Sequence, residues 1–112
     1  MRAFLQRLHL LALQFLHPGS RREDLRTLIC RIDEPNAGRC LAFHDENAER
    51  LSRSWGSSHN HQAWEGGYLD HVREVMNLAV LLYSMLQIIG RPLPFSLSDA
   101  LLVLFLHDAE KP

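Results

Sequence analysis

Apolar residues at helical spacing dominate the second half of the chain and favour a helical fold. From Tyr68 to Leu86 they recur every three or four positions, which places them on one side of a long helix. Gly66-Gly67 gives the backbone freedom before this helix, and Gly90 with Pro92 is expected to end it. β-Branched residues are sparse throughout the chain. We therefore predict an all-α protein.

A second apolar run covers residues 100–106 and has no polar side. Ser96 followed by Asp99 resembles a capping box, so we expect a helix that begins just after Ser96. A helix that is apolar on every side is typical of the centre of a domain. We therefore expect this helix at the centre of the domain, and we expect a lone chain to expose apolar surface.

The first half of the chain also predicts helices. Residues 1–16 carry a leucine-rich stripe that indicates a helix in the core or at an interface. A short helix is expected over residues 22–32, and residues 35–38 are expected to break the chain. Asp45 is then expected to cap a short helix over residues 48–55.

Composition limits the function classes. With 112 residues the chain is long enough for one domain only, and its net charge of −1 makes binding to nucleic acid by bulk charge improbable. Two cysteines without a CxxC motif predict neither a disulfide framework nor a structural zinc site, so we expect a cytoplasmic protein with reduced thiols. Residues 1–16 are interrupted by polar side chains, so neither a signal peptide nor a membrane span is expected.

Histidines near helix ends suggest a metal site. His71 stands on the apolar side of the long helix, and His107-Asp108 follows the apolar run. Imidazole and carboxylate suit divalent transition ions, and the negative end of a helix dipole attracts a cation. The structural alternatives are a hydrogen-bonded core histidine at position 71 and a polar helix cap at positions 107 and 108. A second pair, His44-Asp45, looks like a helix cap and is discounted.

Two segments resemble the HD-domain superfamily of metal-dependent phosphohydrolases. Residues 58–71, SHNHQAWEGGYLDH, are similar to the segment HHAYxGGLLEH of the branch that includes bacterial 3′-to-5′ exoribonucleases, with His61 in place of its leading histidine. Residues 107–111, HDAEK, are similar to the family pattern HDxGK, with Glu110 in place of the glycine. The resemblance covers residues 58–112, about half of the chain.

The resemblance implies an all-α, compact helical bundle of HD-domain type and a metal-dependent phosphohydrolase that acts on a nucleotide or phosphodiester. His71, His107 and Asp108 would be the catalytic metal ligands. The ion would be manganese, magnesium, iron, cobalt, nickel or zinc, and a bound water would be the nucleophile. His61 and Lys111 would contact phosphate, although His61 could also be a metal ligand or a plain loop residue. The partner would be a phosphate-containing small molecule or a nucleic-acid end.

One family feature has no counterpart. The family's further aspartate lies in a later helix, whereas this sequence ends at Pro112, so the predicted bundle is incomplete at its C-terminus. We expect a single domain over residues 1–112, with an N-terminal helical segment (1–57) and the N-terminal part of an HD-type domain (58–112). We also expect a homo-oligomer or a missing C-terminal part. The alternative function is a non-catalytic HD-like scaffold, a fragment, or a helical interaction or oligomerisation module.

Overall fold

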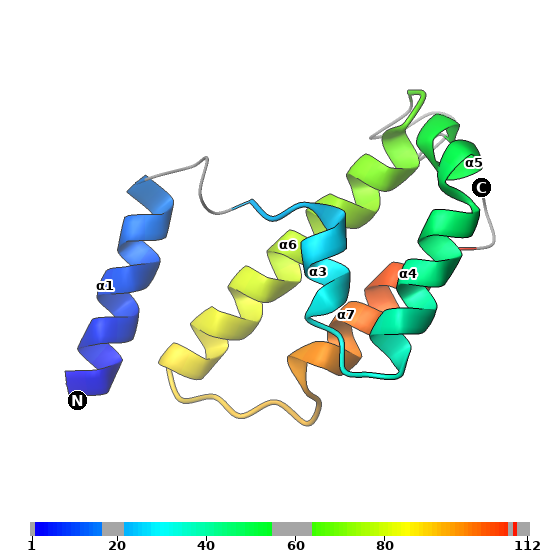
Figure 1. Ribbon diagram of the computed structural model, residues 1–112. Coiled ribbons are helices and arrows are strands. Elements are labelled where there is room, and N and C mark those ends of the chain that lie inside the picture. Colours follow the sequence, from blue (N-terminus) through cyan, green and yellow to red (C-terminus); the bar gives the residue numbers. More distant parts are fainter. Residues whose placement is uncertain (1, 17–21, 55–63, 108, 110–112) are drawn as a thin grey trace.

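The computed structural model describes residues 2–16, 22–54, 64–107 and 109, with the backbone alone for residues 11–16 (Figure 1). This part of the chain is helical and contains no strand, so the predicted all-α class is confirmed. No helix within it is both long enough and apolar enough to cross a membrane. The helices are α1 (Arg2–Leu16), α3 (Leu25–Cys30), α4 (Asn36–Glu46), α5 (Ala48–Arg53), α6 (Gly67–Ile88) and α7 (Leu97–Leu106).

The core lies where α6 and α7 pack on each other and on the three shorter helices α3, α4 and α5. Burial of its aliphatic and aromatic side chains provides the main favourable free energy of folding. Each of the helices from α3 to α7 contributes at least one residue. The core residues are Leu25, Leu28, Ile29, Ile32, Ala37, Cys40, Leu51, Tyr68, Val72, Met76, Leu101 and Phe105.

The ends of α6 and α7 agree with the signals in the sequence. Gly66 precedes α6 with φ 83°, and Gly90 follows it with φ 75°, values that L side chains rarely adopt. The hydroxyl of Ser96 accepts a hydrogen bond of 3.0 Å from the backbone N–H of Asp99 at the start of α7. The predicted helix boundaries in this half of the chain are confirmed.

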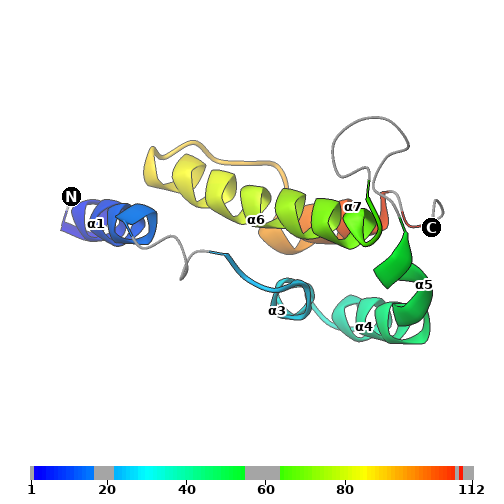
Figure 2. The ribbon, with the colours of Figure 1, turned by 90° about the horizontal axis from the view of Figure 1, so that it is seen from above.

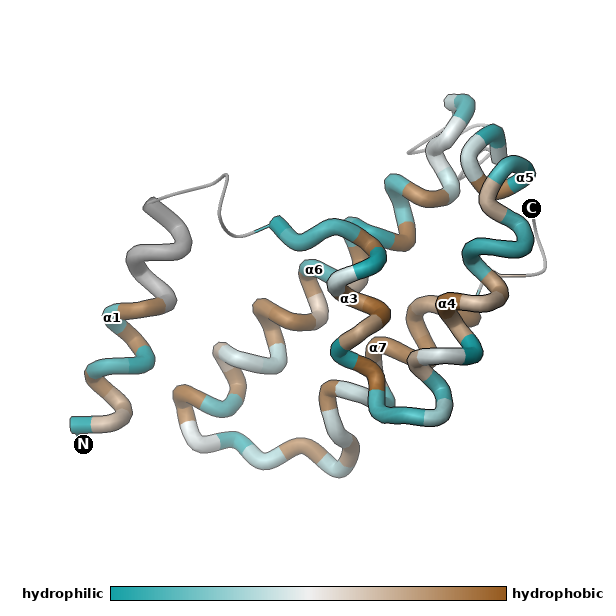
Figure 3. Tube along the Cα trace, in the orientation of Figure 1, coloured by the Kyte–Doolittle hydropathy of each residue, from teal (hydrophilic) through white to brown (hydrophobic). Residues whose placement is uncertain are grey.

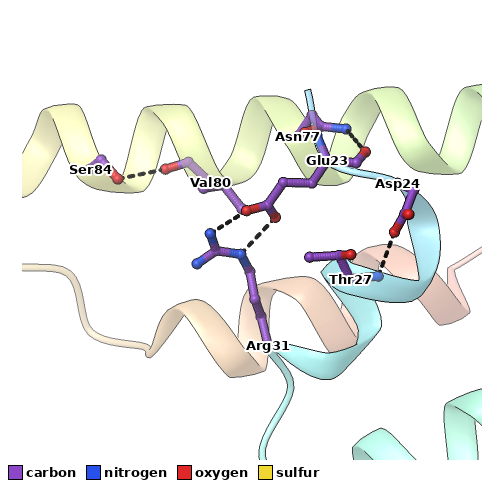
Figure 4. A network of polar contacts seen from close by, with 7 residues as sticks. All are labelled: Glu23, Asp24, Thr27, Arg31, Asn77, Val80 and Ser84. Carbon is purple, nitrogen blue, oxygen red and sulfur yellow. Dashed lines mark hydrogen bonds and ion pairs between the residues drawn. The ribbon is translucent and has the colours of Figure 1, made fainter. Parts of the chain in front are cut away.

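The helix α3 is shorter than the predicted helix over residues 22–32. Asp24 takes an extended conformation and its carboxylate accepts a hydrogen bond of 2.8 Å from the backbone N–H of Thr27 (Figure 4). Hydrogen bonding by the side chain of Thr27, together with this backbone bond, holds the pKa of Asp24 below its usual range, because both favour the ionised carboxylate. The cap therefore fixes Leu25 as the first helical residue.

Residues 35–38 do not form a break between helices, contrary to the prediction. Pro35 is the cap of α4, and residues 36–38 form its first turn. Proline is tolerated there because the first turn of a helix lacks acceptors for its own N–H groups. Asp45 consequently lies inside α4 and does not cap α5, which begins after Asn47.

The first helix forms as predicted, and its described side chains lie outside the core. Residues 2–10 are all exposed, and α1 lies at one end of the molecule beside the C-terminal half of α6 (Figures 1 and 2). The radius of gyration is 15.5 Å, against roughly 13 Å for a compact domain of this length. The described part of α1 therefore departs from the compact bundle that we expected.

The helix α7 is buried on one side only. Leu101 and Phe105 belong to the core, whereas Val103 is 64% exposed and Leu106 is 47% exposed. The prediction that this helix lies at the centre of the domain is therefore wrong for the described residues. An all-apolar run has no periodicity that distinguishes a covered face from an open one, so the sequence pattern could not show which side lies inside.

An amide clasp joins the segment before α3 to α6 (Figure 4). The side chain of Asn77 accepts a hydrogen bond of 2.9 Å from the backbone N–H of Glu23 and donates one of 3.0 Å to its carbonyl. Nε of Arg73 donates to the same carbonyl at 2.9 Å, while Arg31 forms an ion pair with the Glu23 carboxylate. The backbone N–H and carbonyl of Glu23 are thus hydrogen-bonded to side chains of α6.

Replacing Asn77 with alanine is expected to lower the free energy of unfolding by about 2 kcal/mol, because it leaves both part-buried backbone groups of Glu23 without the amide. Urea denaturation followed by circular dichroism measures the change. Gln87→Ala removes an exposed amide from the same helix and is the matched control. Equal stability of the two variants would show that the clasp contributes nothing.

Candidate metal centre

The site lies where the start of α6 meets the end of α7. The two helices are antiparallel: Tyr83, near the end of α6, donates a hydrogen bond of 3.2 Å from its hydroxyl to the carbonyl of Phe95, just before α7. At the other end of the pair, the rings of His71 and His107 have their centroids 5.8 Å apart and their planes inclined at 55°. Two imidazoles from distant parts of the sequence are therefore in contact.

Core residues beside the two histidines fix their positions. Val72, which follows His71, is 1% exposed, and Phe105, two residues before His107, is 3% exposed. The ring of Phe105 packs edge-on against Phe43 of α4, with centroids 6.2 Å apart and an interplanar angle of 89°. Close packing on both sides sets the register of α7 against α6, and this register brings the histidines together.

The end of α7 selects the tautomer of His107. Its Nδ1 lies 2.5 Å from the carbonyl oxygen of Leu104, which has no proton to give, so Nδ1–H is the donor. A neutral ring then carries its lone pair on Nε2. Metal-bound histidines commonly hold their second nitrogen in this way, against a carbonyl or carboxylate. Sequence analysis did not identify this contact with Leu104. The signal for it is a histidine directly after the last turn of a helix, where backbone carbonyls have no partner within the helix.

Both histidines lie at the edge of the core. His71 is half-buried and His107 is exposed, so a small ligand can reach the pair from solvent. The prediction that His71 lies on the apolar side of its helix is consistent with this position. The C-terminal end of α7 lies at the two histidines, and the partial negative charge of its backbone carbonyls favours a cation.

Hydrogen bonds fix the segment that leads into α6. The indole N–H of Trp64 donates a hydrogen bond of 2.8 Å to the carboxylate of Asp70, in the first turn of α6. The N–H of Tyr68 donates to the carbonyl of Ser54 at 3.0 Å and so ties α6 to the end of α5. Trp64 therefore anchors the segment just before α6 to the helix that carries His71.

The structure places two of the five predicted site residues. His71 and His107 are brought together, whereas His61, Asp108 and Lys111 lie outside the described residues. Within the described ranges, no group of three or more histidine, cysteine, aspartate or glutamate side chains could hold a metal ion. The described part of the site thus contributes two imidazole donors.

His44-Asp45 provides a comparison with this site. Asp45 is paired with Arg26 at 3.0 Å and with Nδ1 of His44 at 3.2 Å. The guanidinium of Arg26 holds the pKa of Asp45 below its usual range, and His44 adds to the effect. The prediction that this pair is a helix cap is wrong. Both residues lie within α4, and Asp45 forms an ion pair with Arg26 of α3.

Comparisons of the chain with models of protein families, with curated proteins and with solved structures return no match. The geometry of the two histidines and the chemistry of their neighbours therefore carry the functional argument.

Proposed function

We propose that this chain is a metal-dependent phosphohydrolase of HD type that acts on a nucleotide or a phosphodiester. In this proposal the bundle is the N-terminal part of an HD-type domain. His71, His107 and Asp108 bind a divalent ion, which is manganese, magnesium, iron, cobalt, nickel or zinc. The observation that supports the proposal is the contact between the rings of His71 and His107, with centroids 5.8 Å apart.

The donor chemistry of the pair fits a metal ion. Two imidazoles suit first-row transition ions, and an adjacent carboxylate also accepts magnesium. The bond from Nδ1 of His107 to Leu104 presents Nε2 as the ligating atom. A bound divalent ion would supply a water of lowered pKa and would polarise a phosphoryl oxygen.

The protein's own groups have three roles in this proposal. His71 and His107 hold their ligating nitrogens at fixed positions because α6 and α7 are locked by the core around them. Asp108 contributes a negative charge that balances part of the charge of the ion. His61 and Lys111 contact the phosphate, Lys111 as a point charge and His61 as a hydrogen-bond donor.

The second candidate is a non-catalytic HD-like scaffold or helical interaction module. The observation that favours it is the amount of apolar surface left open on α1, α6 and α7. Large contiguous apolar patches mark interaction sites. A scaffold of this kind retains the helices and the two histidines without a complete metal shell.

Metal retention separates the two candidates. The purified chain is incubated with Mn²⁺ or Ni²⁺, dialysed, and analysed for metal by elemental analysis, and the same samples are assayed for phosphate release from a panel of nucleotides. We expect about one ion per chain and metal-dependent phosphate release. The variants His107→Ala and Asp108→Ala are expected to lose both.

The control variant is His44→Ala, which removes an imidazole beside a carboxylate on α4 and is expected to retain the metal. Stoichiometric metal retained by the chain would count against a scaffold without a complete metal shell. A chain that retains no metal would contradict the proposed metal centre.

A further inference from the structure

The C-terminal half of α6 has an exposed apolar face. Four large side chains lie on it: Leu78 (50% exposed), Leu82 (56%), Met85 (41%) and Ile89 (69%). Their spacing of four, three and four residues places them on one line along the helix, the pattern of a helix that pairs with another helix. We name these four residues the α6 stripe. Apolar residues also recur along the rest of α6 (Figure 3).

From Leu78 to Ile89 the stripe has no charged residue beside it on the helix, and the exposed Glu74 lies one turn before Leu78. Between Glu74 and Arg91 the chain contains no aspartate, glutamate, lysine or arginine. A helix face that remains in water normally carries charged residues opposite its buried side. In α6 after Glu74 the core side and the open side are both uncharged, so the open side there has the composition of a contact surface.

The absence of charge indicates which partner fits. When the same face of two copies meets across a two-fold axis, residues near the axis lie beside their own equivalents, so a charge at the centre of the face would meet a like charge. The stripe meets this condition because the positions that flank it are uncharged. These are Ala79, Leu81, Leu86 and Ile88, which correspond to the positions that set partner choice in paired helices.

A lipid surface is a poorer match for the same face. Amphipathic helices that bind membranes carry lysine and arginine along the border of their apolar face. From Glu74 to Arg91 the α6 region lacks that border, and the net charge of the whole chain is −1. We propose that the α6 stripe is the interface of a homodimer, in which the stripes of two copies pack against each other.

Sedimentation equilibrium over a range of protein concentrations tests the proposal. The wild-type chain is expected to approach twice its single-chain mass of 12.9 kDa as the concentration rises. Leu82→Glu places two like charges in the interface and is expected to sediment at the single-chain mass with unchanged helical circular dichroism. Gln87→Glu is the matched control, since Gln87 is exposed on the same helix but lies about 200° around it from Met85.

Cysteine cross-linking gives a second measurement, which does not depend on the folding of the glutamate variant. Leu82→Cys, in a Cys30→Ser background that removes an exposed thiol, is expected to form a disulfide-linked dimer under mild oxidation. A wild-type chain of single-chain mass at every concentration would overturn the proposal. Co-sedimentation of such a monomer with phosphatidylglycerol vesicles would assign the stripe to a lipid surface instead.

Discussion

Replacing His71 with alanine is expected to slow metal-dependent phosphate release by at least about 100-fold. A Lewis-acid ion stabilises the transition state by several kcal/mol, and each 1.36 kcal/mol corresponds to about a factor of ten in rate. Removing one of two imidazoles that lie in contact weakens the binding of that ion. The measurement is hydrolysis of bis(p-nitrophenyl) phosphate and of a nucleotide panel in the presence of Mn²⁺.

Two comparisons make this result specific. His44→Ala removes an imidazole outside the site and should leave the rate within about twofold of the wild-type rate. Circular dichroism of His71→Ala should show an unchanged helix content, because the ring is only half-buried. Full metal-dependent activity in a folded His71→Ala chain would show that the reaction takes place elsewhere.

Leu101→Ala is expected to have the largest effect on stability. Leu101, on α7, is 0% exposed and belongs to the hydrophobic core. Truncating a leucine in such a position costs roughly 3–5 kcal/mol, because the buried methyl groups are lost and a cavity remains. A chain of 112 residues is expected to be stable by roughly 6–15 kcal/mol, so the variant loses a large fraction of that stability.

Urea denaturation measures this change, and Val103→Ala is the matched control. Val103 lies two residues away on the same helix and is 64% exposed, so its truncation is expected to change the free energy of unfolding by less than about 0.5 kcal/mol. Similar losses in both variants would mean that the open side of α7 is covered in solution.

The boundaries of α6 and α7 were predictable because their signals are local. Gly66 and Gly90 act through the φ angles that glycine permits, and Ser96 acts through the hydroxyl of its own side chain. Each signal depends on the residue type alone, so a single sequence is enough to identify it. The prediction for residues 35–38 was wrong because the same local signal has two meanings. Proline near glycine indicates a turn, yet proline also fits the start of a helix, and only the surrounding packing decides between the two.

The contact between His71 and His107 agrees with the prediction that these residues share a site. Their positions on apolar helices, and the resemblance of the segments that carry them, select them from seven histidines, and their role as metal ligands stays a prediction. The amide clasp of Asn77 on Glu23 was not predictable. It joins residues 54 positions apart through a backbone group, and neither end has a local pattern that marks it.

The antiparallel arrangement of α6 and α7 determines where the chain can change in length. The segment that joins the two helices lies at the opposite end of the pair from the histidines. Extra residues there would lengthen a surface turn and leave both helices in place. One residue inserted within α7, after Leu101, would rotate His107 by about 100° and shift it by about 1.5 Å, so the rings would separate. A peptide tag is therefore better tolerated between Arg91 and Phe95 than anywhere in α7.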